Sequence, residues 1–479
     1  MVRRGHFARS ANLNIVRLAK DASMSVTHDF STTDPGFAYA GPPSLDLLHT
    51  RAMQQRAHEL IPGGCHTYAK GDDQYPLLSP GFIARGRGCH IWDVDGNEYI
   101  EYNMGGRAVT LGHAYPSVCE AAQQAIQLGA NFTRPAETEV RCAEMFLSAI
   151  EGAEMVKFTK DGSTATSAAM KLARAHTGRD MIAFCIDHPF FSYDDWFIGL
   201  TPCDAGIPQT IKDLSATFNY NDIASVEAMF DQHHDRIAAV IMEPAKYEDP
   251  QDSFLHKVQE LCQKNGAVFV LDEMITGFRW DAGGAQKVYD IVPDLSTFGK
   301  ALANGFALSA LCGKRELMDL GGIYHDKERV FLLSTTHGAE THAMAAGIET
   351  IRIHMEEPVT ETLRRQGERL TVGGRQVIRD LGLEEYVQIE GKPCNLVFVC
   401  RDPEGKPSQG YRSLFIQEMA KRGVFGPSFV VSYSHSDADI DHTVNAMHET
   451  LKVYQQSLTD GYEKYLVGRP SKIVYRKFN

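Results

Sequence analysis

Two residues that could do chemistry together lie in one stretch of the chain, Val268–Arg315. Asp272 ends the apolar run VFVLD, which is typical of a buried parallel strand. Lys300 follows in a turn between Gly299 and Ala301. This pair suits pyridoxal phosphate (PLP), because the lysine can hold the aldehyde as a Schiff base and the acid can keep the pyridine nitrogen protonated. Taken alone, each residue is more simply a helix cap or a solvated surface lysine.

A third feature, residues 157–179, could bind the phosphate group of that cofactor. In KFTKDGSTATSAAMKLARAHTGR a strand ends, a turn around Gly162 and Ser163 follows, and an alanine-rich helix begins. Free amides at such a helix start, together with the hydroxyl groups, form an anion site. An ordinary N-cap is the alternative, because Ser and Thr are favoured there. The three features together favour a PLP site.

The composition is that of a globular protein with an acidic balance. The chain has 479 residues, a formal net charge of −13, and 43% hydrophobic and 23% charged residues. The negative charge argues against nucleic acid or an anionic membrane as the partner, and no apolar run approaches the roughly 20 residues that span a bilayer. Ten cysteines without a CxxC pair indicate reduced thiols. We therefore expect a cytoplasmic protein that acts on small molecules.

The elements around these residues alternate in a way that indicates a parallel sheet covered by helices. The expected strands are MVKFT, MIAFCI, IAAVIMEP, AVFVLDE and ALSALCG, all after residue 154. Before them we expect a helix at Asp46–Leu60, a hairpin that turns at Asp95-Gly96, and helices near Pro116–Leu128 and Pro135–Ile150. After them come a long helix from Ala343, strands near Val387–Ile389 and Asn395–Val399, and a helix around Ile440–Leu458.

Four motifs resemble those of class III aminotransferases, which are PLP enzymes of fold type I. They are LDEMITGFR, the lysine segment STFGKALANG, the loop and helix DGSTATSAAMKLARAHTGR, and STTHGAETHAMAAG. The segments ELIPGG, WDVDGNEYIEY, LGHAYP, TFNYND and HSDADID are similar to the glutamate-1-semialdehyde aminomutase branch of that family. The similarity covers nearly everything after about Ser44.

The resemblance implies an α/β fold with a large domain and a smaller α+β domain built from both chain ends. The large PLP-binding domain, residues 106–345, would contain a mostly parallel sheet of the seven-stranded type. Residues 44–105 and 346–479 would form the small domain. Residues 1–43 are rich in basic residues and turn formers, and they would be an N-terminal arm or precede the true start. The resemblance also implies a homodimer with shared sites.

The resemblance assigns roles position by position. Lys300 would hold the cofactor and shuttle a proton between substrate and cofactor, and Asp272 would pair with the pyridine nitrogen. Gly162 and Ser163 would hold the phosphate. Further cofactor contacts are implied for Glu243, for Phe190 and Met274 on the two ring faces, and for Thr335, with Thr336 as the fallback, at the phosphate of the neighbouring protomer. Without the resemblance, Phe190 and Met274 would be core-packing residues.

Several positions depart from the family pattern. Asp161 stands where serine is common, and a carboxylate beside a phosphate is unfavourable unless it points away or caps the helix. Thr164 replaces a glutamate. Phe190-Phe191-Ser192 replaces Tyr-His-Gly, which removes polar groups from one face of the pocket and suggests a flat or cyclic acceptor. These changes leave PLP binding in place and leave the substrate open.

The departures also bear on the reaction. The stretch between Trp196 and Phe218 is shorter than the gating insert of the aminomutases, and RGVFGPSFVVSYSH lacks their acidic residue. We therefore expect a ping-pong aminotransferase that moves an amino group from an amino acid, with L-glutamate as the candidate donor, to a ketone or aldehyde, in a biosynthetic pathway. The alternatives are an intramolecular aminomutase, a PLP-dependent decarboxylase and a non-catalytic ligand-binding protein. Intact Lys300 and Asp272 count against the last.

Three residues are candidates for substrate binding. Arg107 and Arg134 fall in segments that line the active-site mouth of the family, and an arginine fork suits a carboxylate. A structural ion pair is the alternative for both arginines. Tyr68 is the third candidate. The segment His435–His442 contains metal-ligand residue types but no recognised ligand spacing, so no metal site is expected.

Overall fold

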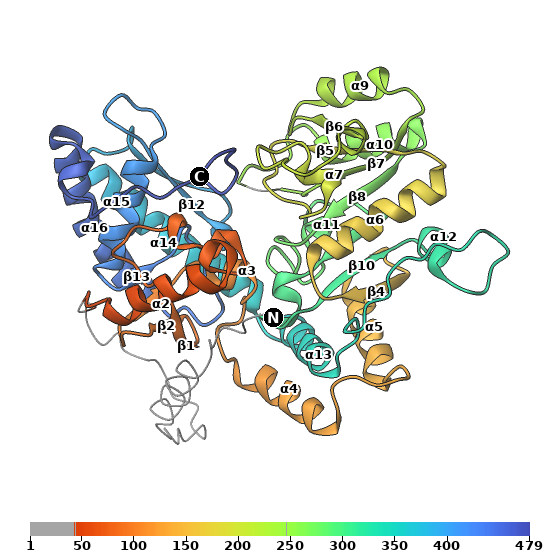
Figure 1. Ribbon diagram of the computed structural model, residues 1–479, viewed down its shortest axis with the longest axis horizontal. Helices are drawn as coiled ribbons and strands as arrows, with labels where there is room; N and C mark the ends of the chain where they lie inside the picture. The colour runs from red at the N-terminus through yellow and green to blue at the C-terminus, as the bar shows by residue number, and fades with distance from the viewer. Residues whose placement is uncertain (1–42, 44, 246) are drawn as a thin grey trace, which may run out of the picture. The chain divides into compact units, whose positions relative to one another are not determined.

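Figure 1 shows the computed structural model of the protein, in which residue 43, residues 45–245 and residues 247–479 are described. These described residues belong to one compact unit. The predicted extension over residues 1–43 lies outside the described residues except for Pro43. Among the described helices, none is long and apolar enough to cross a membrane.

A seven-stranded sheet forms the centre of what we call the large lobe, which consists of this sheet and the helices that cover it. The strands lie in the order β4, β10, β9, β8, β7, β5, β6. They are β4 (Met155–Thr159), β5 (Met181–Cys185), β6 (Ser215–Phe218), β7 (Ile237–Met242), β8 (Val268–Asp272), β9 (Leu295–Phe298) and β10 (Ser309–Gly313). Five neighbours from β9 to β6 run parallel, whereas β10 is antiparallel to both β9 and β4. The predicted mostly parallel sheet is confirmed.

Alternate residues of the buried strand β8 pack on opposite faces of this sheet. Val270 belongs to a hydrophobic cluster with residues of α6 (Gly162–Thr177). Phe269 and Leu271 belong to a second cluster with residues of α9 (Ile223–Gln232) and α10 (Phe254–Asn265). Helices therefore cover both faces, which explains why the strand sequence is apolar throughout.

The small lobe, which contains the four-stranded sheet and the C-terminal helices, is built from both chain ends. Its sheet has the order β1 (Ile83–Arg87), β2 (His90–Asp93), β3 (Glu98–Glu101), β13 (Val424–Phe425). β2 and β3 form the predicted hairpin, with Gly96 in the turn at a φ of 88°. β13 pairs in parallel with β3, which joins the end of the chain to its beginning. A separate antiparallel pair consists of β11 (Val387–Glu390) and β12 (Val397–Cys400).

The remaining elements are helices and short 3-10 turns. The longer helices are α2 (Leu48–Leu60), α4 (Pro116–Leu128), α5 (Glu137–Ala149), α13 (Thr341–Glu356), α14 (Val359–Asp380), α15 (Gln409–Ala420) and α16 (Asp437–Asp460). The short ones include α3 (Met104–Arg107), α7 (Asp195–Ile198), α8 (Gln209–Lys212), α11 (Ala285–Val288), α12 (Arg315–Met318) and the 3-10 turns η2 (Tyr68–Lys70), η4 (Lys300–Ala303) and η6 (Pro393–Asn395).

The predicted strands and helices are found within a few residues of their expected ends. Several elements were not predicted, among them β1, β13, α15, β6 and α14. β6 reads SATF and is too short and polar to show an apolar pattern. α14 was not separated from the long helix before it, because the break at Glu357-Pro358 is short.

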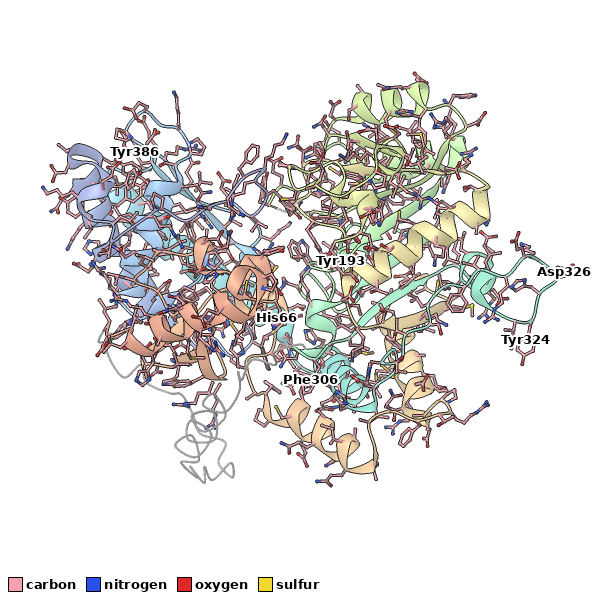
Figure 2. All side chains as sticks on the ribbon, viewed as in Figure 1. His66, Tyr193, Phe306, Tyr324, Asp326 and Tyr386 are labelled. Carbon is pink, nitrogen blue, oxygen red and sulfur yellow. The ribbon has the colours of Figure 1, made fainter. Side chains whose placement is uncertain are left out.

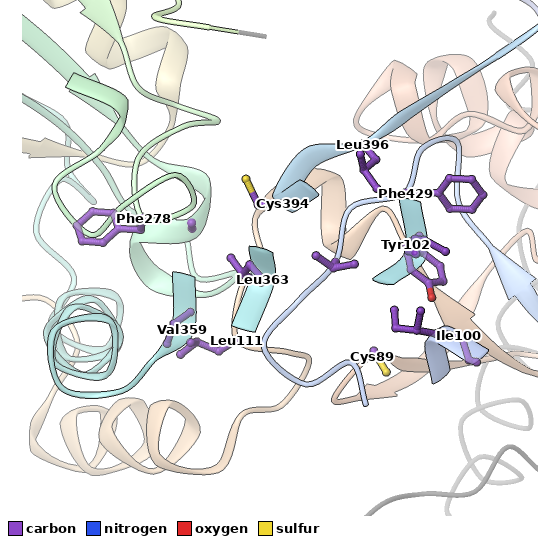
Figure 3. Close-up of a cluster of buried hydrophobic side chains, with 14 of the residues drawn as sticks. Cys89, Ile100, Tyr102, Leu111, Phe278, Val359, Leu363, Cys394, Leu396 and Phe429 are labelled. Carbon is purple, nitrogen blue, oxygen red and sulfur yellow. The ribbon is translucent and has the colours of Figure 1, made fainter. Parts of the chain in front are cut away.

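The main hydrophobic core is continuous between the lobes. Phe278 of the large lobe and Leu396 and Phe429 of the small lobe belong to one cluster of buried side chains, part of which Figure 3 shows. Burying a large apolar side chain contributes ~1.5–3 kcal/mol. This shared core fixes the small-lobe residues that reach the site relative to those of the large lobe.

Candidate active site

Asp272 is buried at the carboxyl end of β8, with an exposed fraction of 2%. Its Oδ1 accepts hydrogen bonds from the amide of Met274 and from the hydroxyl of Thr297, both at 3.0 Å. Burial raises the pKa of Asp272 to about 6, although the charge of Lys300 and both hydrogen bonds act to lower it. Because Oδ1 takes both bonds, Oδ2 is left to face a further positive or donor group.

Lys300 begins η4 directly after β9, the neighbour of β8 in the sheet. Its φ of 44° is unusual for a residue with a side chain, and such strain is concentrated at functional sites. The turn is held by Asn304, whose side-chain amide accepts from the amide of Leu111 and donates to the carbonyl of Gly112, each at 3.0 Å. The backbone around Lys300 is therefore tied to the segment that follows α3.

Burial lowers the pKa of Lys300, and this effect prevails over the nearby charges of Asp272 and Glu243, which act to raise it. The charges of Arg107 and Arg279 lower the same pKa further. The five side chains are thus close enough to interact electrostatically, although they come from four separate segments of the sequence. Glu243 itself is buried just after β7, where its amide donates to Nδ1 of His188 at 3.1 Å.

The start of α6 provides an anion site beside Met274. Asp161 is the N-cap: Oδ1 accepts from the amide of Thr164 at 2.8 Å and Oδ2 from its hydroxyl at 2.9 Å. The carboxylate at this position therefore caps the helix, which is one of the two arrangements that make it compatible with a phosphate. Other first-turn amides of a helix have no partner within it and can bind an anion.

The glycines at this point allow a close approach of the backbone to Met274. A Cβ added to Gly162 would lie 2.8 Å from Sδ of Met274, and one added to Gly299 would lie 2.7 Å from the same atom. Ser163, next to Gly162, is 4% exposed, and its Oγ accepts from the amide of Tyr193 at 3.1 Å. Met274 thus connects the start of α6 to the turn that carries Lys300.

The aromatic segment after β5 splits into a buried and an exposed part. Phe191 is 2% exposed and packs in the cluster with α6, and its carbonyl accepts from the hydroxyl of Thr166 at 2.9 Å. Phe190 is 45% exposed and contacts the ring of Phe197 with centroids 5.9 Å apart. An exposed ring beside the start of α6 is free to stack on a ligand.

Arg107 lies at the end of an unusual turn. Met104, Gly105, Gly106 and Arg107 have φ values of 45°, 60°, 72° and 72°, which is one turn of left-handed helix. Left-handed backbone costs roughly 1–2 kcal/mol per residue with a side chain. The carbonyl of Arg107 accepts from Nη2 of Arg279 at 2.8 Å, and this bond holds the turn in place.

The guanidinium of Arg107 has neutral partners. Nε donates to Oδ1 of Asn395 at 2.8 Å and Nη2 lies 3.5 Å from Oγ of Ser428. Among the described residues it forms no ion pair, so the alternative of a structural ion pair does not hold for this arginine. Burial lowers its pKa, while the charge of Glu243 acts to raise it.

Among the described residues, no hydrogen bond or ion pair joins the other predicted residues to this cluster. Arg134 is exposed in a groove of about 700 Å³ between α4, α5 and α13. Tyr68 is 69% exposed in η2. Thr335 and Thr336 are exposed in the loop after α12, and the carbonyl of Thr336 accepts from Asn131 at 2.9 Å. Figure 2 shows Tyr324 and Asp326 at the tip of the same loop, which projects from the large lobe.

Arg279, Asn395, Ser428 and Thr297 contact predicted site residues but were not themselves predicted. Arg279 lies in the motif LDEMITGFR, which was a usable signal. Ser428 lies in RGVFGPSFVVSYSH, a segment that the resemblance to the family singles out, whereas Asn395 gave no signal, since it lies 288 residues from Arg107 in the sequence. Their place in the site follows from the packing of the small lobe on the large one.

The sheet, the buried acid and the lysine at a neighbouring strand end are those of a PLP-dependent transferase of fold type I. A family model described as "Aminotransferase class-III" matches residues 68–451, and the chain belongs to this family. It is therefore an enzyme of the PLP-dependent class III aminotransferases.

Relatives of known name come from bacteria. Glutamate-1-semialdehyde 2,1-aminomutase of Sulfurihydrogenibium sp. (strain YO3AOP1) is 31% identical over 430 residues, which cover 84% of this chain and 98% of the relative. The enzyme of the same name from Desulfitobacterium hafniense (strain DSM 10664 / DCB-2) is 32% identical, covering 83% of this chain and 96% of the relative.

Solved structures show the same fold. The FumI protein of Sphingopyxis sp. MTA144, in its PLP internal aldimine form, is 30% identical with a TM-score of 0.79, covering 89% of this chain and 99% of that one. An omega-transaminase from Sphaerobacter thermophilus is 26% identical with a TM-score of 0.76, covering 85% and 98%.

The residues present fit PLP. The buried carboxyl of Asp272, whose pKa is raised to about 6, calls for a positive partner such as a protonated ring nitrogen. The start of α6 offers amides, and the glycine at its first position lets a group approach where a Cβ would clash with Met274. The strained turn presents the lysine between these two features.

Proposed function

We propose that the protein is a ping-pong aminotransferase that moves an amino group from an amino-acid donor, first of all L-glutamate, to a ketone or aldehyde acceptor in a biosynthetic pathway. The observation that carries the proposal is the guanidinium of Arg107. It is half-buried, it lies within electrostatic range of Lys300, and it has neutral partners. A charge of this kind beside a catalytic lysine suits the carboxylate of an amino acid or a keto acid.

Lys300 and Asp272 are the catalytic residues of this proposal. When bound, PLP supplies an aldehyde that accepts an amino group and a ring that takes up electrons from the substrate. Nζ of Lys300 removes and returns the proton at the substrate Cα, and the lowered pKa of this lysine makes the neutral amine available. Oδ2 of Asp272 holds a proton on the pyridine nitrogen through charge and hydrogen bonding.

The other cofactor-binding residues orient the ring and the phosphate. Phe190 and Met274 are proposed to lie on the two ring faces, since Met274 is next to the start of α6 and Phe190 precedes Phe191, whose carbonyl accepts from Thr166 of that helix. Gly162 and Ser163 would bind the phosphate through their amides. Glu243 contributes a negative charge near Lys300.

The segment between β5 and β6 supports release of the product rather than its retention. It folds as α7 and α8 joined by a short loop, with Trp196 and Phe197 buried against Phe184. A closing lid needs residues of low local stability, and buried aromatic anchors oppose such motion. An ordinary aminotransferase must let its keto product leave before the acceptor enters.

The intramolecular aminomutase reaction is the second candidate. Relatives that are 31–32% identical over most of their length carry the name glutamate-1-semialdehyde 2,1-aminomutase. This candidate predicts turnover of one substrate without any separate acceptor, which separates it from the first.

We further propose a homodimer with shared sites. The loop after α12 exposes Ile323 at 66%, Tyr324 at 92% and Phe331 at 70%, which are large apolar surfaces for a monomer. Thr335, or its neighbour Thr336, follows in this loop and would reach the phosphate in the site of the other protomer. Arg134 and Tyr68 are both exposed and are proposed to complete the mouth of a shared site.

The organisation proposed from the sequence is retained. We divide the chain into an extension (1–43), a large domain (106–345) and a small domain formed by 44–105 and 346–479. A cytoplasmic location is supported by the ten cysteines, all of which are free thiols in the structure.

The first experiment is a visible absorption spectrum of the purified PLP-loaded enzyme before and after L-glutamate is added without an acceptor. We expect the band of the Lys300-bound cofactor to be converted to that of the amino form, and a keto acid to restore it. In the Lys300→Ala variant we expect at least a 10⁴-fold slower conversion, about the upper range for acid–base catalysis.

Each result has a separate meaning. A loaded band that L-glutamate leaves unchanged, with glutamate-1-semialdehyde consumed without an acceptor, would favour the aminomutase. A protein that shows no band after PLP is added would contradict the assignment of Lys300.

A further inference from the structure

The guanidinium of Arg107 has a fixed orientation because a hydrogen bond to another residue holds it. An arginine side chain has several rotatable bonds and loses rotamer freedom when it is held. Nε donates to Oδ1 of Asn395 at 2.8 Å, which is a full hydrogen bond, whereas the contact of Nη2 with Ser428 is long at 3.5 Å. Asn395 therefore defines the plane of the guanidinium.

Asn395 is itself held rigidly. It is 4% exposed and ends η6, whose backbone lies directly against α14. A Cβ added to Gly367 of α14 would lie 1.8 Å from the carbonyl oxygen of Pro393, so this helix and η6 are in backbone contact. The amide of Asn395 also donates to the carbonyl of Lys392 at 2.8 Å. Groups held on packed elements position a site more accurately than groups on free loops.

The chemistry of the pair leaves one edge of the guanidinium open. Arginine has only donors, so Asn395 must turn its oxygen toward it. A carboxylate binds a guanidinium either across Nε and one terminal nitrogen or across the two terminal nitrogens. With Nε occupied by Asn395, the open edge is the one formed by Nη1 and Nη2.

We propose that Asn395 is a positioning residue that makes the enzyme selective for carboxylate-bearing substrates, because it orients the Nη1–Nη2 edge of Arg107 toward the substrate without neutralising its charge. This inference rests on the proposed role of Arg107. An aspartate at the same place would hold the guanidinium equally well but would pair with its charge. A neutral amide is therefore the side chain that both orients Arg107 and leaves it able to bind an anion.

The test uses the PLP-loaded enzyme. The donor half-reaction is monitored through the loss of the absorption band of the Lys300-bound cofactor. Selectivity is the ratio of the kcat/KM values for an amino acid and for the amine that lacks only its α-carboxylate; the pairs are L-alanine with ethylamine and L-phenylalanine with 2-phenylethylamine. The variants are Arg107→Ala, Asn395→Ala, Asn395→Asp and the double variant of Arg107→Ala with Asn395→Ala. Ser428→Ala is the matched control, since it removes the long contact.

We expect Asn395→Ala to lower the selectivity by about 10-fold, the usual effect of one hydrogen bond to a charged group, and Asn395→Asp to lower it more. The loss should be in KM for the amino acid and should exceed any loss for the amine, which a general loss of structure would not produce. In the Arg107→Ala background, Asn395→Ala should not change the selectivity any further. Ser428→Ala should change the selectivity by less than about 3-fold.

The outcomes separate the two proposals. If Arg107→Ala removes the selectivity and Asn395→Ala leaves it intact, the role of Asn395 is wrong while that of Arg107 stands. If Arg107→Ala leaves the selectivity intact, or if no amino acid reacts faster than its amine, the carboxylate site at Arg107 is wrong and the inference falls with it. If Asn395→Asp retains full selectivity, the argument from the neutral amide is overturned.

Discussion

At the scale of single residues, the site depends on keeping a buried carboxyl group charged. Asp272 is almost fully buried, and burial favours its neutral form, so its pKa rises to about 6. Two hydrogen bonds and the charge of Lys300 oppose this rise. The hydroxyl of Thr297, which stands opposite Asp272 in the register of β8 and β9, supplies one of the bonds. Thr297 is therefore a determinant of cofactor binding.

The substitution Thr297→Val tests this dependence. It removes the hydroxyl at nearly constant volume, and the pKa of Asp272 should rise further because its charged form loses a donor. A hydrogen bond to a charged group contributes ~1.5–3 kcal/mol, so we expect the dissociation constant of PLP to rise about 10-fold at pH 8. At pH 6 the loss should be greater, because more of the variant is protonated at Asp272. Fluorescence titration of the cofactor-free protein measures both.

The neighbouring substitution Ser296→Ala is the control. Ser296 points away from Asp272, and its hydroxyl donates to Oε1 of Gln286 at 2.8 Å. We expect this variant to bind PLP with unchanged affinity at both pH values. Equal losses in the two variants would show that the effect comes from the strand and not from the carboxyl group.

The sequence predicts the parts of the site that a local motif carries. Asp272 ends the apolar strand β8 and Lys300 follows the neighbouring strand β9; parallel strands place their ends at one edge, so the meeting of these two residues could be foreseen. The left-handed turn at Arg107 could not, since Met104 has no preference for that conformation. Asn395 could not either, because its contact depends on the docking of η6 beside α14.

At the scale of elements, the small lobe is tied together by a buried polar network between β2 and α16. His90 contacts Oε1 of Glu98 at 2.8 Å through Nδ1 and Oδ1 of Asp439 at 3.1 Å through Nε2. Asp439 also closes the capping box of α16 with Ser436. Among the described residues, Cys89, His90 and Asp439 have ligand atoms within 4.8 Å of one another, the one group that could hold a metal ion. The hydrogen bonds indicate a charged imidazolium instead.

This network predicts a pH-dependent contribution to stability. Burial acts to lower the pKa of His90, but Asp439 and Glu98 outweigh it and the pKa is raised above 6.5. The contribution of His90 is therefore full below about pH 6.5 and is lost as the pH rises through the raised value. The pKa of Asp439 is lowered from 3.8, so its contribution is present above that pH and is lost in stronger acid.

We expect His90→Gln to lower the free energy of unfolding by about 3 kcal/mol at pH 5.5, as for a broken buried ion pair, and by clearly less at pH 9. Urea unfolding followed by circular dichroism at the two pH values measures the difference. The control is His448→Gln on α16, whose pair with Glu449 is exposed and contributes little. A loss at His90 that is the same at both pH values would contradict an imidazolium at this position.

At the scale of the whole molecule, the C-terminal residues contact both the segment around Asp73 and the large lobe. Nη2 of Arg469 donates to the carbonyl of Asp72 at 2.9 Å, and the amide of Lys472 donates to that of Asp73 at 2.8 Å. Further along, Nη2 of Arg476 pairs with Oδ2 of Asp73 at 2.5 Å. The segment after residue 468 therefore runs beside the one that leads to Tyr75. Burial raises the pKa of Tyr75 to about 12, although the charge of Arg107 acts to lower it.

The same C-terminal segment reaches the loop between α7 and α8. Sγ of Cys203 lies 3.5 Å from the carbonyl of Arg476, and Tyr475 packs against the cluster that includes Phe191 and Trp196. Burial raises the pKa of Tyr475 to about 12. Its ring is thus the apolar anchor of the segment on the large lobe, and the partly exposed ion pair of Arg476 adds little to it.

The substitution Tyr475→Ala should release this segment without unfolding the protein. A partly buried aromatic ring contributes ~1.5 kcal/mol, so opening of the segment should become about 10-fold more frequent. Trypsin cleavage at Lys472 and Arg476, followed by mass spectrometry, measures that frequency when opening is fast relative to cleavage. The control is Phe478→Ala, whose ring is 80% exposed and should not change the rate. Equal cleavage rates in wild type and Tyr475→Ala would show that polar contacts alone hold the segment against the large lobe.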